Sequence, residues 1–140
     1  MAEVLLRMAL PPRSSWCVAS AGLAVCQGGR ASEAASSAIA EVGGDLSRHR
    51  SRPVTEELVQ EAAAIIAMTS DHAQQLITRY PSVRDKLFLL RSFDPHSPAQ
   101  GNIADPFCGS LADYRECRDL IRQAIPGLAD YLTQADQTIR

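Results

Sequence analysis

The feature that most restricts the fold is an alternation of short apolar runs with longer amphipathic segments. Residues 64–68 form an apolar run of strand length, residues 86–90 place four apolar residues after Lys86, and a shorter run at 16–19 leads into Ser20-Ala21-Gly22. A continuous apolar run of this length is expected for a strand that is covered on both faces. Strands that alternate with helices predict an α/β fold, a three-layer αβα sandwich with a small parallel sheet.

The segments of the first half between these runs carry helix signals. Residues 1–9 have apolar side chains at helical spacing, with an acid early and an arginine late. The Ala-rich segment 31–42 ends at Gly43-Gly44, which is typical of a left-handed helix terminator. Thr55 is a predicted cap for a helix that begins with two glutamates.

Two further helices are predicted in the second half. Thr69 or Ser70 can cap the first of them. Ser110 with Asp113 three residues later resembles a capping box that opens the last helix. We expect Pro126 to kink or split that helix, because proline removes a backbone hydrogen bond.

Composition restricts the class of protein. With 140 residues, 46% of them apolar and 21% charged, the chain predicts one globular domain over residues 1–140. A formal net charge of -2 provides no basic field for nucleic acid or an anionic membrane surface. No run approaches the roughly 20 apolar residues of a membrane helix. We therefore expect a cytoplasmic protein without nucleic-acid or membrane partners; the oligomeric state is left open.

The cysteines predict free thiols rather than a metal site. None of the four stands in a C-x-x-C pair or has a histidine at ligand spacing. Free thiols are typical of a reducing compartment. No metal and no organic cofactor is implied.

In open parallel sheets, ligands bind outside the carboxyl ends of the strands, which directs attention to the loops after residues 20, 69 and 90. Several segments here resemble, in order and spacing, the low-molecular-weight protein tyrosine phosphatase family, which includes the bacterial protein arginine phosphatases. The similar segments run from the first residue to the last helix; they are MAEVLLR (1–7), SAG (20–22), SRHRSR (47–52), VT (54–55), MT (68–69), SFDP (92–95), DPF (105–107) and GS (109–110).

The resemblance also implies that an essential loop is absent. In the family, a loop of pattern C-x-x-x-x-x-R-S-P, with the nucleophilic cysteine, directly precedes the helix that residues 1–7 resemble. No arginine stands six positions after any cysteine: those positions hold Leu23, Ser32, Tyr114 and Gln123. We expect the chain to be truncated at its N-terminus and inactive as given, without the first central strand, the nucleophile and the phosphate-binding arginine.

Four residues of this chain take site roles by the same resemblance. Asp105 is implied to be the general acid of a cysteinyl-phosphate mechanism, and Phe107 a wall of the substrate pocket. Ser20 and His49 are implied to hydrogen-bond the cysteine loop and hold its shape.

The expected function is therefore hydrolysis of a phosphorylated protein, with phosphotyrosine or phosphoarginine as substrate. The stretch from Phe107 to Ser110 is closer to the arginine phosphatase pattern than to the tyrosine-specific one. Two alternatives stay open: a non-catalytic, phosphatase-like binding module, and an arsenate reductase. The latter needs two further cysteines after the middle strands, and residues 60–100 contain none.

Overall fold

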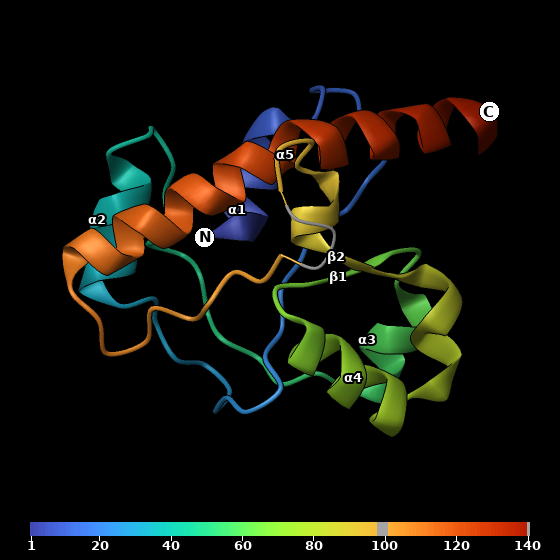
Figure 1. Ribbon diagram of the computed structural model, residues 1–140, viewed down its shortest axis with the longest axis horizontal. Coiled ribbons are helices and arrows are strands. Elements are labelled where there is room, and N and C mark those ends of the chain that lie inside the picture. Colours follow the sequence, from blue (N-terminus) through green and yellow to red (C-terminus); the bar gives the residue numbers. More distant parts are fainter. Residues whose placement is uncertain (98–100, 140) are drawn as a thin grey trace.

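The computed structural model describes residues 1–97 and 101–139. Its elements alternate as the sequence predicts (Figure 1). In chain order they are α1 (Ala2–Ala9), α2 (Glu33–Ala40), α3 (Glu56–Glu61), β1 (Ile65–Ala67), α4 (Ser70–Arg79), the 3₁₀ helix η1 (Pro81–Lys86), β2 (Leu87–Leu89), the 3₁₀ helix η2 (Leu90–Phe93) and α5 (Leu111–Ile139).

The sheet confirms two of the three predicted strands. Within the described residues it consists of β1 and β2, which are parallel and pair Ile65 with Leu87, Ile66 with Phe88 and Ala67 with Leu89. Helix α4 forms the crossover between the two strands. Figure 1 shows α1, α2 and α5 on one side of the strands and α3 and α4 on the other, so the fold is an α/β sandwich with a small parallel sheet.

The prediction of a third strand at residues 16–19 is wrong for the described part of the chain, which forms no ladder there. A β-strand is defined by backbone hydrogen bonds to a partner strand, and here a side chain, rather than a partner strand, hydrogen-bonds the backbone. The carbonyl oxygen of Val18 accepts hydrogen bonds from Arg7 Nε at 3.1 Å and Arg7 Nη2 at 2.5 Å. Backbone pairing appears farther on, as an isolated parallel bridge between Gly22 and Pro53.

The predicted caps are confirmed. The side chain of Thr55 accepts a hydrogen bond from the backbone N–H of Leu58, and that of Thr69 accepts one from His72. Gly43 follows α2 with a φ of +83°, the left-handed conformation that favours glycine.

Helix α5 differs from its prediction at one point. Ser110 and Asp113 form the expected reciprocal cap, in which the Ser110 N–H bonds Asp113 Oδ2 at 2.6 Å and the Asp113 N–H bonds Ser110 Oγ at 3.2 Å. Pro126, however, lies inside one helix that runs from Leu111 to Ile139, so the expected split is wrong. Buried side chains on both sides of the proline hold the two halves in one line of packing; among them are Ile121, Ala124, Ile125, Leu128 and Leu132.

Gly127 allows α5 to pack directly on the backbone after β2. A Cβ at this position would lie 2.2 Å from the carbonyl oxygen of Phe93. Arg118, a buried charge of the same helix, ties α5 to α2 because its Nη1 donates to the carbonyl oxygen of Ala38 at 3.0 Å and to Glu41 Oε2 at 2.6 Å.

Buried apolar side chains of the described residues form two clusters, one on each side of the sheet. The larger joins α1, α2 and α5 and includes Ile66 at its edge. The smaller joins α3, α4 and η1 and includes Ala67, with Ile65 packed against it. Adjacent residues of β1 thus face opposite layers, as the pleat of a strand requires. None of the helices in the described ranges has both the length and the apolar character needed to cross a bilayer.

Candidate active site

Two of the four predicted site residues meet at the first turn of α1. Glu3 lies in that turn, and its carboxylate accepts a hydrogen bond from the hydroxyl of Ser20. His49 Nδ1 lies 3.9 Å from Glu3 Oε2, and Arg7 Nη2 lies 2.7 Å from Glu3 Oε1. Glu3 therefore joins the loop after residues 16–19 and the loop after α2 to one helix end. Glu3 was not among the predicted site residues; its only signal in the sequence was an acid in the first turn of a helix.

Arg52 also stabilises the loop that carries Ser20. Its Nε donates to the carbonyl oxygen of Ser20 at 3.0 Å, while the backbone N–H of Gly22 bonds the carbonyl oxygen of Arg52 at 2.9 Å. These bonds fix the backbone directly after the Ser20 side chain.

Asp105 lies on a loop at the edge of the sheet. Its loop crosses the carboxyl end of β1, where the Ile103 N–H bonds the carbonyl oxygen of Met68 at 2.9 Å and Asn102 Oδ1 accepts from the Ser70 N–H at 2.8 Å. The Asp105 side chain is exposed, and its Oδ1 accepts a hydrogen bond from the Phe107 N–H at 3.0 Å.

The Cys117 thiol of α5 is influenced by charges from the start of α1 and from the Asp105 loop. Burial raises the pKa of this thiol; the positive charge of the Met1 amino group opposes the shift and the Asp105 carboxylate adds to it. Burial also lowers the pKa of the Met1 amino group. The Met1 amino group and the Asp105 carboxylate thus both lie within electrostatic range of Cys117.

Phe107 is presented to solvent by a tight turn. The Gly109 N–H bonds the carbonyl oxygen of Pro106 at 2.7 Å, and Cys108 has a φ of +60°. Phe107 is 78% exposed, so its ring is free to contact a bound group.

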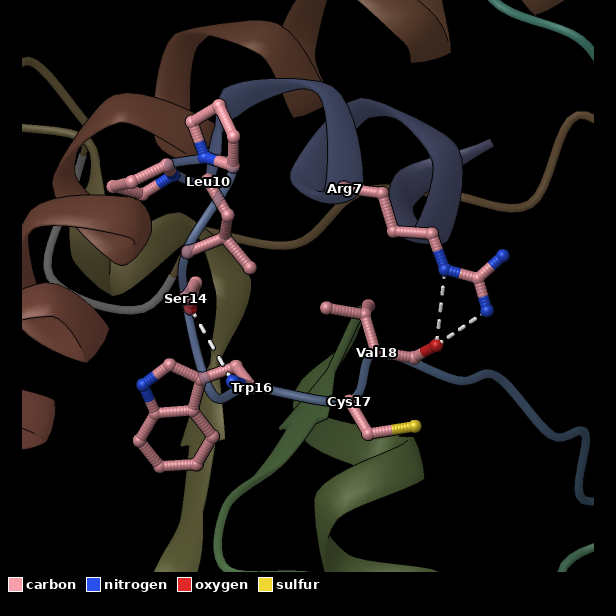
Figure 2. A pocket seen from close by; sticks show the side chains of 8 residues that line it. Arg7, Leu10, Ser14, Trp16, Cys17 and Val18 are labelled. Atoms are coloured by element: carbon pink, nitrogen blue, oxygen red, sulfur yellow. Dashed lines mark hydrogen bonds between the residues drawn. The ribbon is translucent and has the colours of Figure 1, made fainter.

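The cavity in Figure 2 shares Arg7 with this cluster but is lined by none of the four predicted site residues. It measures about 370 Å³ and lies along the last turn of α1 and the extended segment that follows. Figure 2 shows Arg7 reaching across it to the carbonyl oxygen of Val18, with the thiol of Cys17 beside them. Among the residues that the structure describes, no group of three His, Cys, Asp or Glu side chains could hold a metal ion.

The arrangement is suited to bind an anion, such as a phosphate, from which a leaving group departs. The N-terminal end of a helix offers free backbone N–H groups and a partial positive charge, which favour a phosphate. An exposed carboxylic acid, Asp105, lies on a loop that crosses the carboxyl end of β1, where open α/β sheets bind ligands. Fold and site together define an α/β protein with a candidate site for an anion.

Comparison with known proteins identifies the family. A family model described as low molecular weight phosphotyrosine protein phosphatase matches residues 1–138, and the chain belongs to that family. A protein-arginine-phosphatase of Geobacillus stearothermophilus is 37% identical over 115 residues, which are 82% of this chain and 76% of the relative. The probable low molecular weight protein-tyrosine-phosphatase AmsI of Erwinia amylovora is 33% identical over 132 residues, 94% of this chain and 81% of that protein.

Solved structures agree with this assignment. The YwlE arginine phosphatase from Geobacillus stearothermophilus superposes with a TM-score of 0.86 at 33% identity, over 99% of this chain and 87% of that one. A YwlE mutant described as having a phosphorylated active site serine gives a TM-score of 0.85 at 33% identity, over 94% and 86% of the two chains. The tyrosine phosphatase AmsI gives a TM-score of 0.83 at 30% identity, over 94% and 83%.

Proposed function

We propose that residues 1–140 belong to one phosphatase domain, inactive without its nucleophile loop, which when complete dephosphorylates proteins through a cysteinyl-phosphate intermediate with Asp105 as general acid and base. One observation carries the proposal: the Asp105 loop is anchored at the carboxyl end of β1 by the hydrogen bond from the Ile103 N–H to the Met68 carbonyl oxygen, so its exposed carboxylic acid is available to protonate the leaving group of a phosphate bound at that edge of the sheet.

The reaction runs in two steps. A cysteine thiolate forms a bond to phosphorus while the bond from phosphorus to the leaving oxygen or nitrogen breaks, and Asp105 gives its proton to the leaving atom. The Asp105 carboxylate then takes a proton from a water molecule whose oxygen attacks phosphorus, and the S–P bond breaks to return the thiolate and release inorganic phosphate. The phosphorylated active site serine described for the YwlE mutant supports a covalent phosphoenzyme in this family.

Ser20 and His49 act on the phosphate-binding loop rather than on the substrate. Both contact Glu3 in the first turn of α1, next to the place where that loop would meet the helix. Phe107 forms a wall for the side chain that carries the phosphate, because an exposed aromatic ring can stack on a phenol or a guanidinium group.

The nucleophile belongs, in this proposal, to a C-x-x-x-x-x-R-S-P loop that precedes α1, outside these 140 residues. None of the four cysteines present has an arginine six positions later. Cys117 is also chemically unsuited to the role, since burial raises its pKa and a thiol attacks only as its thiolate. The central strand that would carry the loop fits with the extended segment 16–18, which lacks a ladder partner within the described chain.

Phosphoarginine is the second candidate substrate beside phosphotyrosine. The stretch from Phe107 to Ser110 favours it, and so do the 37% and 36% identities to two protein-arginine-phosphatases. Asp105 suits either substrate, because both the phenolate oxygen and the guanidine nitrogen need a proton as they leave.

The test is a comparison of two forms of the protein. The 140-residue chain and a form extended by the in-frame codons upstream, here called the extended chain, are assayed with p-nitrophenyl phosphate, a phosphotyrosine peptide and a phosphoarginine peptide. We expect turnover in the extended chain only, abolished by replacing its loop cysteine with serine. Full turnover by the 140-residue chain would refute the assignment of the nucleophile. An extended chain that binds phosphopeptides without hydrolysing them would instead favour a non-catalytic binding module.

A further inference from the structure

Two loops that flank the candidate site are joined into one surface, here called the double loop and made of residues 20–32 and 46–54. Backbone hydrogen bonds run from Val54 N–H to the Gly22 carbonyl oxygen at 3.0 Å and from Ser51 N–H to that of Gly29 at 2.8 Å. The Ser51 hydroxyl also donates to the carbonyl oxygen of Cys26 at 2.6 Å and accepts from the Gly29 N–H at 3.0 Å. The two segments therefore behave as one unit, although they are far apart in the sequence.

The charge of the double loop is opposite to that of the whole chain. The chain has 16 acidic and 14 basic residues, yet residues 20–32 and 46–54 contain no aspartate or glutamate. They contain Arg30, Arg48, Arg50 and Arg52. An excess of one sign on a confined surface of an otherwise slightly acidic protein points to a partner of the opposite sign.

Two of these arginines have internal tasks. Arg52 bonds the carbonyl oxygen of Ser20, and Arg50 Nη1 bonds the carbonyl oxygens of Ser47 and His49 at 3.1 and 2.7 Å. Neither forms a salt bridge with a carboxylate in residues 1–97 and 101–139.

Arg30 and Arg48 remain available. Both are exposed, and in the described ranges no carboxylate lies within salt-bridge distance of either. The carboxylate of Asp45 accepts hydrogen bonds from the N–H and hydroxyl of Ser47 at 2.8 and 2.9 Å, and these bonds lower its pKa, with a smaller contribution from the charge of Arg48. The two guanidinium groups can therefore bind a carboxylate of another molecule.

The double loop also adjoins the site. Ser20 belongs to its first segment and His49 to its second, and both contact Glu3 at the start of α1. A polypeptide whose phosphorylated side chain enters at α1 must therefore pass this surface with its neighbouring residues. We propose that the double loop binds acidic side chains that flank the phosphorylated residue of a protein substrate, with Arg30 and Arg48 as the contacting cations. The proposal deepens the proposed function, and it needs a peptide that extends beyond the phosphorylated residue itself.

The binding test uses the 140-residue chain itself and does not depend on catalysis. Fluorescein-labelled, unphosphorylated peptides with a central tyrosine and either four glutamates or four glutamines around it are titrated at low salt, with anisotropy as the readout. We expect the glutamate peptide to bind more tightly. Arg30→Gln/Arg48→Gln should weaken it by roughly three- to twentyfold, the sum of two exposed charge contacts. Arg13→Gln/Arg84→Gln is the matched control, since it removes the same charge from exposed arginines outside the double loop.

Three outcomes overturn the proposal: unchanged affinity in Arg30→Gln/Arg48→Gln, an equal loss in the control, or equally tight, arginine-dependent binding of a single-stranded oligonucleotide of the same charge.

A second arm measures kcat/KM of the extended chain. The Arg30→Gln/Arg48→Gln form should lose its preference for acidic over neutral phosphopeptides while p-nitrophenyl phosphate turnover stays unchanged. If Arg30→Gln/Arg48→Gln loses the preference for the acidic peptide in the binding arm but the extended chain shows no turnover at all, the proposed function alone is refuted. If the extended chain turns over normally but has no preference for acidic phosphopeptides, the double-loop proposal alone is refuted.

Discussion

Replacing Asp105 with asparagine in the extended chain tests the proton donor with little disturbance of the loop. Asp105 is exposed, and its Oδ1 accepts the Phe107 N–H at 3.0 Å. An asparagine carbonyl can accept the same hydrogen bond, so the turn survives, and exposed substitutions of this kind change stability by about 0.5 kcal/mol or less. The variant therefore loses the titratable proton and keeps the geometry.

The expected loss follows from that single change. A positioned general acid contributes about 10²- to 10⁴-fold, which at about 1.36 kcal/mol per factor of ten is about 2.7 to 5.4 kcal/mol of the barrier. The loss must depend on the leaving group. p-Nitrophenolate leaves without much help, whereas an unsubstituted phenolate needs the proton, so the ratio of parent to variant should be larger for phenyl phosphate.

Single-turnover kinetics with the two esters measure this dependence, because they isolate the first bond-breaking step. Asp85→Asn, a change at an exposed aspartate of η1, serves as the control and should leave both rates unaltered. Parent-like rates for Asp105→Asn, or an equal loss on both esters, would remove the residue from the role of acid.

Three further predictions concern the scaffold. Leu128→Ala should lower the free energy of unfolding by about 2 to 5 kcal/mol in a denaturant titration, because Leu128 is only 2% exposed and its truncation leaves a cavity. A loss below about 1 kcal/mol would contradict tight packing of α5. Gly127→Ala should cost about 1 to 3 kcal/mol in the same assay, since its Cβ would meet the Phe93 carbonyl oxygen at 2.2 Å, and parent-like stability would refute that close approach. Glu41 hydrogen-bonds Arg115 and Arg118, which lowers its pKa from 4.5 to about 2, so the stability it supplies is present above pH 4.5 and is lost as the pH falls through about 2. Glu41→Gln should therefore lower Tm near pH 7 and match the parent near pH 2, and a constant Tm difference across that range would exclude the ion pair as the cause.

Local sequence patterns were sufficient for most elements. The runs predicted at 64–68 and 86–90 contain β1 and β2. Thr55 and Thr69 each cap the helix that was predicted to begin directly after that threonine. Residues 16–19 have the same local character, yet no ladder forms there in the described chain. The difference is the partner, which a local pattern does not encode.

Pro126 does not split the last helix, for the opposite reason. The loss of one backbone hydrogen bond was weighed without the buried side chains on both sides of the proline, which favour a continuous helix. Tertiary packing outweighed a local preference, as it does for helix propensities in general.

The candidate site was less accessible to local reasoning than the fold. Asp105, Phe107, Ser20 and His49 were named only through the family resemblance, because nothing in their own neighbourhoods distinguishes them from turn and loop residues. Glu3 was missed since its bonds to Ser20 and its approach to His49 join positions 17 and 46 residues away, and no periodicity reports such a contact.

The anchors of the Asp105 loop explain how an exposed acid can have a defined position. On one side, Ile103 is buried and its N–H bonds the Met68 carbonyl oxygen, directly after β1. On the other, the reciprocal bonds between Ser110 and Asp113 fix the start of α5. Only six residues separate Ile103 from Ser110, so the span cannot carry Asp105 far from the end of β1. The acid can thus shift by small local rotations to meet a leaving group while the two anchors keep it near the carboxyl end of β1.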